Sequence, residues 1–311
     1  MENQNVTTEF ILLGLSSNPE IQILLFFVFL IIYTITVLGN VLIILIIRTD
    51  HHLHTPMFYF LSHLAFVDIS YSTVTVPKIM ANCIANQKSI SLVGCIVQIF
   101  SIINFACVDF SLLSVMAYDR YAAICNPLHY STIMRKQICR QLVGGSWIMG
   151  FLDALINTYP LKHLRFCWMP SINHYTCELP VILSLSCSHT FNNYILLIAT
   201  SIIFGFIPLF LIILSYIYII SSILHIHSAK GRSKAFSTCS SHLIVVCMFL
   251  FSVVFRYLKP NFKSPTDLEK VISIQYTILT PMLNPIIYSL KNKEIKVVIR
   301  NSLKNIGNIS I

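Results

Sequence analysis

Long apolar stretches recur seven times along the chain, and polar residues concentrate between them. Each stretch is a continuous apolar run, without the ten-residue alternation typical of membrane β-strands. A helix that crosses about 30 Å of hydrocarbon needs about 20 mainly apolar residues. The pattern therefore predicts seven membrane-spanning helices, at Ile21–Ile47, Met57–Met80, Cys95–Ala117, Leu142–Tyr159, Asn193–Ile220, Leu243–Tyr257 (extended upstream through Ala235) and Val271–Leu290.

The composition supports a membrane protein. The 311 residues are 56% hydrophobic and 11% charged, whereas soluble domains carry about 25% charged residues. No internal repeat, low-complexity tract or long linker separates the apolar stretches. We therefore expect an all-α membrane protein with one domain: a tail at residues 1–20, a helix bundle at 21–290 and a second tail at 291–311.

The positive charges predict the orientation in the membrane. With an extracellular amino terminus, 13 of the 21 Lys and Arg residues lie on the inner side. Cytosolic loops carry an excess of Lys and Arg, so this orientation is favoured, with a cytosolic tail. The sequon at Asn5 would then be a glycosylation site. The net charge of +9 is explained by topology, and no nucleic-acid partner is expected.

Ten cysteines divide between the two sides of the membrane. Cys95, Cys167, Cys177 and Cys187 fall on the predicted outer side, where disulfides persist. Cys83 also lies there, as a free thiol or as a rival disulfide partner. Spacing alone leaves the connectivity open. Three histidines of the outer loop lie near these cysteines, but loop stapling is favoured over a metal site.

Four motifs carry a specific resemblance. They are MAYDRYAAIC at Met116–Cys125, LHTPMFYFLS at Leu53–Ser62, KAFSTCSSHL at Lys234–Leu243 and PMLNPIIYSL at Pro281–Leu290. In this order they resemble the signature blocks of the odorant (olfactory) receptor family of rhodopsin-like G-protein-coupled receptors, and the resemblance covers nearly the whole chain.

The resemblance implies partners and cross-links. It implies disulfides from Cys95 to Cys177 and from Cys167 to Cys187. It also implies a small volatile ligand and a stimulatory heterotrimeric G protein that raises cyclic AMP, in the plasma membrane and without a cofactor.

An activation switch is expected at the inner end of the bundle. Asp119 and Arg120 can pair and close the bundle, although an interfacial Arg that only obeys charge topology is the alternative. In the resembling receptors this Arg releases to meet the G protein. The further switch residues implied by the resemblance are Tyr216, Leu250, Asn284, Pro285 and Tyr288. At Leu250 the chain departs from the family, which usually has Tyr between Phe and Gly here.

Two acids lie within predicted spans. A carboxylate deep in a membrane helix is costly and is normally functional or paired. Asp68 and Asp109 are candidates for sharing a proton or a sodium ion; the alternative is one protonated acid that donates a buried hydrogen bond. The family usually has Glu at position 109, so the shorter Asp weakens the case for sodium.

The ligand is expected in the outer half of the bundle. By position, the resemblance points to Ile102, Ile103, Ala106, Thr200, Phe204, Val253, Val254, Tyr257 and Thr277. These mostly apolar residues suit a small, neutral, largely hydrocarbon molecule. No charged side chain is expected in the middle of this cavity, with Arg256 and Lys259 near its rim. Ile102 stands where amine receptors have Asp, and the last span lacks the Lys that retinal would need.

Two other classes of function are weaker alternatives. Intramembrane acids also mark ion paths, but transporters often show an internal repeat and none is visible. Intramembrane hydrolysis would need a motif such as HExxH or GxSxG, which the chain lacks. After Leu290, the apolar residues Ile295, Val298, Ile299 and Leu303 predict an amphipathic helix on the inner leaflet.

Overall fold

The computed structural model describes residues 9–85, 87–166, 171–258, 267–292 and 294–300. Within these ranges, the side chains of residues 234–235, 237–238, 252–258 and 267–269 are left undescribed. Val253, Val254, Tyr257 and Arg256 are among the latter. Asn5, Cys167 and Lys259 lie outside the described ranges.

Each predicted span corresponds to a helix or to a run of consecutive helical segments. Two spans are divided in the structure by a short π-helical segment. The elements are α1 (Pro19–Thr49), α2 (Pro56–Ile84), α3 (Leu92–Cys125), α5 (Lys136–Thr158), α7 (Phe191–Ser201) with η3 (Ile202–Phe206) and α8 (Ile207–Leu224), α9 (Ala229–Leu258), and α10 (Asp267–Ile274) with η4 (Gln275–Leu279) and α11 (Thr280–Lys291).

Local sequence signals set where the helices begin. Asn18 accepts a hydrogen bond from the backbone N–H of Glu20 (2.9 Å), and Pro19 follows at the first helical position. Ser91 accepts from the N–H of Gly94 (3.0 Å) at the start of α3. Such side chains satisfy N–H groups that have no partner within the helix.

The bundle buries polar side chains and exposes apolar ones. Phe27, Phe210 and Ile217 are more than half exposed, as expected of surfaces that face lipid. Among the described residues, three segments are long and apolar enough to cross a bilayer by length and composition alone: Pro19–Thr49, Leu92–Cys125 and Phe191–Leu224. The other spans carry more polar residues, and they cross as members of the bundle.

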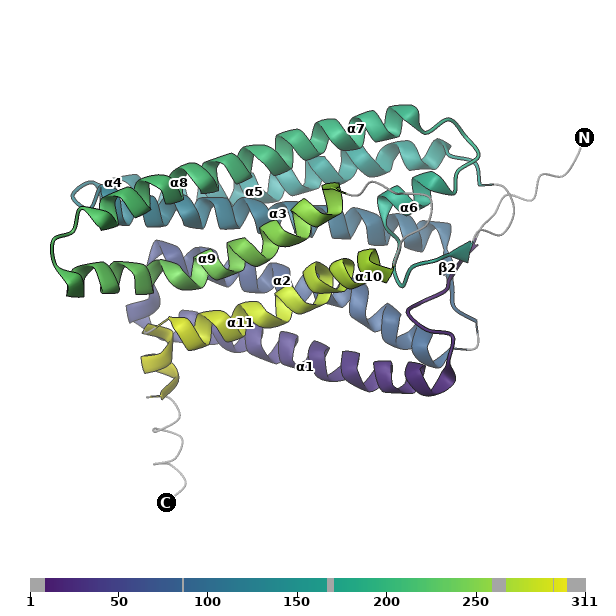
Figure 1. The fold of residues 1–311 in the computed structure, drawn as a ribbon, viewed down its shortest axis with the longest axis horizontal. Coiled ribbons are helices and arrows are strands. Elements are labelled where there is room, and N and C mark those ends of the chain that lie inside the picture. The colour runs from purple at the N-terminus through teal and green to yellow at the C-terminus, as the bar shows by residue number, and fades with distance from the viewer. Residues whose placement is uncertain (1–8, 86, 167–170, 259–266, 293, 301–311) are drawn as a thin grey trace, which may run out of the picture.

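The connections gather at two opposite ends of an elongated bundle (Figure 1). One end carries α6 (Leu179–Ser184) and a small sheet in which β1 (Glu9–Leu12) lies between β2 (Ser89–Ser91) and β3 (Ser171–Ile172). β1 is antiparallel to β2 and parallel to β3. The other end carries α4 (Tyr130–Ile133). We call these the cap end and the base end, and the two halves of the bundle the cap half and the base half.

Proline residues cause the irregular helical segments. Pro208 and Pro281 each lie in the first turn after a π-helical segment, η3 and η4 respectively. Proline removes a backbone donor, and its ring displaces the carbonyl group four residues earlier. The helix accommodates this with a wider turn. The structure shows both interruptions as π-helical segments of five residues.

Pro285 lies inside α11 and also leaves a carbonyl group without its helical donor. That group belongs to Pro281, four residues earlier, and Asn40 of α1 donates its side-chain N–H to this oxygen (3.1 Å). Gly39 permits the close approach, because a Cβ there would lie 3.1 Å from the Pro285 ring. α1 thus repairs the interruption in α11.

The expected disulfide between Cys95 and Cys177 is confirmed. It attaches the loop before α6 to the start of α3. Cys187 is also disulfide-bonded; its expected partner, Cys167, lies outside the described residues. Cys83 is a free thiol, so of its two expected states the structure has the unpaired one.

The last described residues form the expected helix after α11. Residues 294–300 are helical. Ile295 is buried against the main apolar core, and Val298 and Ile299 pack on the same core. Leu303 falls outside the described residues. The described part therefore has one apolar face directed at the bundle.

Candidate ligand-binding site and activation switch

A cavity of about 230 Å³ lies within the cap half. Its walls come from α2, α3, α5, α7, η3, α8, α9 and η4, and the segment Cys177–Pro180 covers it. Among the described residues its lining is Tyr71, Ile99, Ile102, Ile103, Ala106, Cys107, Asp109, Phe110, Asp153, Asn157, Cys177, Glu178, Leu179, Pro180, Leu197, Thr200, Ser201, Phe204, Gly205, Phe206, Leu209, Phe249 and Tyr276.

Five of the nine expected ligand-contact residues line this cavity. They are Ile102, Ile103, Ala106, Thr200 and Phe204. The side chains of Val253, Val254 and Tyr257 lie outside the described residues.

The ninth expected ligand-contact residue, Thr277, does not line the cavity in the structure. This residue is fully buried and absent from the cavity wall, which its neighbour Tyr276 lines instead. The Thr277 hydroxyl donates to the backbone oxygen of Ser273 (2.7 Å). Thr277 and Tyr276 both belong to η4. A π-helical turn holds more residues than an α-helical one, so it changes which side chain faces inward.

Hydroxyl groups fasten the covering loop to α10 and η4. Tyr175 donates to the Ser273 hydroxyl (2.7 Å). Ser273 (2.6 Å) and Tyr276 (2.8 Å) both donate to one carboxylate oxygen of Glu178. Burial raises the pKa of Tyr175, and the nearby Tyr276 and Glu178 raise it further. The phenol therefore stays protonated and remains a donor.

The same loop is fastened to α3. The Cys95–Cys177 disulfide links the two segments, and the backbone N–H of Cys177 donates to the side-chain oxygen of Gln98 (3.0 Å). This loop, which we call the roof loop, is therefore held over the cavity by α3 on one side and by α10 and η4 on the other.

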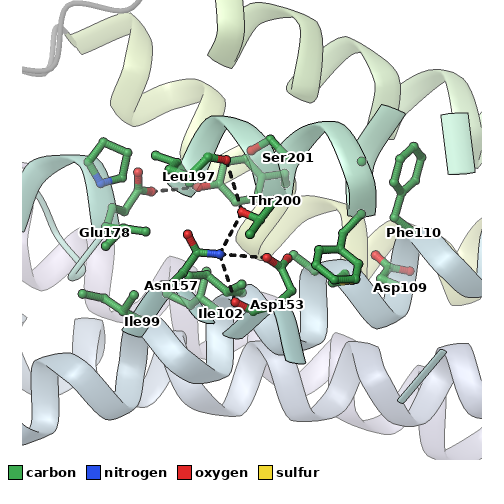
Figure 2. A pocket seen from close by; sticks show the side chains of 18 of the residues that line it. Ile99, Ile102, Asp109, Phe110, Asp153, Asn157, Glu178, Leu197, Thr200 and Ser201 are labelled. Atoms are coloured by element: carbon green, nitrogen blue, oxygen red, sulfur yellow. Dashed lines mark hydrogen bonds between the residues drawn. The ribbon is translucent and has the colours of Figure 1, made fainter. Parts of the chain in front are cut away.

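A polar cluster stands in the middle of the cavity wall, where the sequence predicted no charge. Asp153 and Asn157 of α5 and Thr200 of α7 all line the cavity, and Figure 2 shows them side by side between Glu178 and Asp109. The expectation was wrong because it used only positions suggested by the resemblance. Asp153 lies in the second half of α5, but nothing in the sequence shows which face of that helix points inward.

Close packing of α5 on α3 positions this cluster. Gly150 lies against Val108 and Asn104, and a Cβ at Gly150 would come within 2.7 Å of the Asn104 backbone oxygen. Glycine is therefore required at this crossing. The contact lies one turn before Asp153, and it presses the α5 backbone against α3 beside the cavity.

The inner end of the cavity is aromatic and acidic. Phe110 of α3 and Phe249 of α9 stack with ring centroids 4.6 Å apart and planes inclined by 15°. Asp109 lines the same end. Leu250 packs against the main core, and Phe251 is 54% exposed toward the lipid side. Of the Phe249–Phe251 tripeptide, Phe249 is therefore the residue at the cavity.

The two intramembrane acids have different surroundings. Asp68 is buried, and both of its carboxylate oxygens accept from the Asn284 side-chain amide (3.1 and 2.9 Å). One carboxylate oxygen of Asp109 is buried without a hydrogen-bond partner among the described residues. A shared sodium ion stays a prediction. Asp68 connects α2 to the Asn284–Pro285 segment of α11.

The expected ion pair at the base end is present. Arg120 donates to Asp119 at 2.7 Å, with Asp119 fully buried and Arg120 12% exposed. Tyr130 of α4 donates to the other carboxylate oxygen of Asp119 (2.7 Å). Burial raises the pKa of Tyr130, as does the charge of Asp119, so its hydroxyl remains a donor. The arrangement holds Arg120 against its own helix.

A second buried link at the base end was missed in the sequence. The Tyr216 hydroxyl lies 2.7 Å from Nδ1 of His242, and Nε2 of His242 lies 3.0 Å from the backbone oxygen of Leu113. A carbonyl oxygen only accepts, so Nε2 carries the proton and Nδ1 accepts from Tyr216. The signal was a histidine within the KAFSTCSSHL block. Tyr288, another of the expected switch residues, has a buried hydroxyl without a hydrogen-bond partner among the described residues.

Comparisons with known proteins agree with this arrangement. A family model described as "Olfactory receptor" matches residues 29–305. Human olfactory receptor 8S1 is 50% identical over 94% of this chain and 81% of its own length. Mouse olfactory receptor 5AP2 is 47% identical over 98% of this chain and 97% of its own.

The fold also matches a solved structure. The crystal structure of squid rhodopsin superposes with a TM-score of 0.73 at 19% identity, and the match covers 92% of this chain and 81% of the rhodopsin chain. At this identity the match shows the seven-helix fold and no shared ligand. Fold and family together make the chain a multi-pass membrane receptor, not an enzyme, with a small odorant and a heterotrimeric G protein as its partners. The chain belongs to the olfactory receptor family of seven-transmembrane G-protein-coupled receptors of the plasma membrane.

Proposed function

We propose that this receptor binds a small, mostly apolar, neutral molecule in the cap half and activates a stimulatory G protein, which raises cyclic AMP. The observation that carries this proposal is the roofed cavity of about 230 Å³, whose described lining is mainly aliphatic and aromatic. A concave apolar site with few polar groups suits a compact molecule with one or two hydrogen-bonding atoms.

We further propose that the cap end is extracellular and the base end cytosolic. The disulfides at Cys95–Cys177 and Cys187 lie at the cap end, and disulfides persist in oxidising compartments. Residues 1–20 then form an extracellular tail with a glycan at Asn5, and residues 291–311 a cytosolic tail. This orientation also places the excess of Lys and Arg on the cytosolic side.

In the same proposal the base end is the coupling surface. Arg120, paired with Asp119, becomes available to the G protein when that pair and the Tyr130 contact open. Tyr216, Leu250, Asn284, Pro285 and Tyr288 form the path by which the cavity influences that opening. A ligand drives the change only by its greater affinity for the open conformation.

A cell assay tests the proposal. Cells that express the receptor are exposed to a panel of neutral volatiles, and cyclic AMP is recorded beside membrane current. A cyclic AMP rise that persists when downstream channels are blocked supports it. The matched control is Phe204→Trp, which fills the cavity and should lower potency at unchanged surface labelling. A ligand-gated current without cyclic AMP, or silence across the panel, would overturn it.

A further inference from the structure

The cluster of Asp153, Asn157 and Thr200 has a defined hydrogen-bond polarity. The Asn157 amide nitrogen lies 2.8 Å from an Asp153 carboxylate oxygen, 2.9 Å from the Asp153 backbone oxygen and 2.9 Å from the Thr200 hydroxyl. Both Asp153 oxygens are acceptors, so the group that faces them must be the amide nitrogen and not the amide oxygen. Figure 2 shows these contacts at the cavity wall.

The cluster directs its own hydrogens at protein acceptors. Two amide hydrogens of Asn157 serve the three acceptors just named. The single hydroxyl hydrogen of Thr200 is also taken by a protein acceptor, either the backbone oxygen of Leu197 (3.2 Å) or the Asp153 carboxyl group. The remaining capacity is for accepting: the Asp153 carboxyl group and the Asn157 side-chain oxygen, which receives no hydrogen bond within the described part of the chain. The cluster therefore lacks hydrogens for a ligand and has lone pairs to offer.

The rest of the described cavity wall adds acidic groups and no basic ones, beside the hydroxyl groups of Tyr71, Ser201 and Tyr276. Asp109, Asp153 and Glu178 line it, and the described lining residues include no Lys, Arg or His. Glu178 already accepts from Ser273 and Tyr276. Asp109 lies at the inner end beside Phe110, away from the middle of the wall (Figure 2). Asp153 is thus the carboxyl group that a ligand in the middle of the cavity meets.

We infer that Asp153, Asn157 and Thr200 form a subsite that selects ligands with a hydrogen-bond donor, namely alcohols over the ketones or aldehydes of the same carbon skeleton. This inference rests on the proposed function and specifies its ligand. The alcohol O–H donates to Asp153, while a carbonyl oxygen placed there meets the acceptor groups of this cluster. The surrounding wall is apolar, so a neutral hydroxyl loses less hydration on entry than an ammonium group does. Carboxylic acids are excluded by charge.

The test uses pairs of ligands that differ in one group. A series of volatile alcohols is compared with the ketone or aldehyde and the primary amine of each skeleton, with cyclic AMP as the readout at matched surface labelling. Because a hydrogen bond to a charged group is stronger than a neutral one, each active alcohol should be about 10- to 100-fold more potent than its carbonyl partner.

Asp153→Asn is the decisive variant. Its side-chain oxygen still accepts from Asn157, and its new N–H faces the cavity, so the preference should disappear or reverse toward the carbonyl compound. Thr200→Val provides a second variant: it removes one of the three acceptors that share the two Asn157 hydrogens, which leaves an N–H less engaged beside the cavity and should shift the preference in the same direction. Ile103→Val is the matched control: it changes the wall without a polar group, so both members of a pair should shift alike.

The outcomes separate this inference from the proposed function. Equal potency of alcohols and carbonyl compounds in the parent, or a preference that survives in both Asp153→Asn and Thr200→Val, overturns the subsite while cyclic AMP signalling stands. Silence toward the whole series overturns the proposed function. Amines that exceed the alcohols and lose this advantage in Asp153→Asn support the donor-selecting subsite and overturn the neutral ligand.

Discussion

The cap half and the base half both bury polar side chains, but these side chains have different neighbours. In the cap half, Asp153 and Asn157 border a cavity. In the base half, Asp68 and Asn284 pair with each other, and Asp119 is enclosed by Arg120 and Tyr130. Polar groups beside a cavity keep capacity for a ligand, whereas mutually paired groups hold one conformation. The cap half is therefore suited to recognising a ligand, and the base half to holding the resting conformation.

The largest expected effect removes the attachment of the cap. Cys177→Ser or Cys95→Ser should prevent the receptor from reaching the cell surface, because the roof loop loses its link to α3 and removal of a native disulfide typically costs about 2–5 kcal/mol. Surface labelling of intact cells against total protein measures this. Cys83→Ser, which removes a free thiol, is the control and should be transported normally. Normal surface levels of both disulfide variants would contradict the prediction.

The next effect breaks the base half without touching the cavity. Arg120→Ala should abolish the cyclic AMP response while surface expression and ligand binding remain, since Arg120 is at the far end from the ligand. Lys136→Ala, a basic residue at the start of α5, controls for loss of charge at the same end. Undiminished evoked cyclic AMP at matched surface labelling would show that Arg120 has no part in coupling.

A matched pair of substitutions compares the halves directly. Asn284→Leu strips both hydrogen bonds from the fully buried Asp68, and a buried polar group left without a partner costs about 1–3 kcal/mol. Asn157→Leu strips bonds from Asp153, which water in the cavity can replace, so its cost should be about 0.5–1.5 kcal/mol. Thermal unfolding of the detergent-solubilised receptor measures both. Equal losses would mean that the cavity shields Asp153 from water as fully as the core shields Asp68.

The smallest effect concerns the boundary between the halves. Leu250→Tyr with Phe251→Gly should change basal cyclic AMP at matched surface expression, since a hydrogen bond worth about 0.5–1.5 kcal/mol would be added near α3. A change of about 1.4 kcal/mol alters a minor active fraction up to tenfold. Phe251→Gly alone is the control, because that side chain is largely exposed to lipid. Basal and evoked signals equal to those of the parent would make position 250 a packing residue.

The membrane spans were predictable because the lipid bilayer determines the length and the apolar character of a helix that crosses it. A bilayer demands long apolar helices, and each of the seven windows coincides with a helix or with consecutive helical segments. The paired charges at Asp119 and Arg120 were also predictable, since neighbours in sequence on one helix end are neighbours in space. Periodicity and the motif blocks were enough for these features.

Features that depend on which face points inward were not predictable. Asp153 was overlooked because α5 shows its inward face only once it packs on α3 through Gly150. Thr277 was assigned to the cavity in place of Tyr276, because the π-helical turn of η4 changes the direction of both side chains. His242 was within a recognised block, but its partners, Tyr216 and the Leu113 backbone, come from other helices. The sheet strands pair segments too short to show a pattern.

The position of β1 also determines the order in which the cap can be completed during synthesis. β1 is made first, yet it lies between β2 and β3, and β3 is made only after the span α5 has left the ribosome. If the cap end is extracellular as proposed, Phe10 and Leu12, both fully buried in the finished cap, stay exposed in the lumen until the segment that carries β3 has been synthesised. In the proposed orientation, a chaperone that retains unfinished chains would find its signal in these two side chains. Release of the receptor to the surface would then indicate that β1 has paired with both β2 and β3.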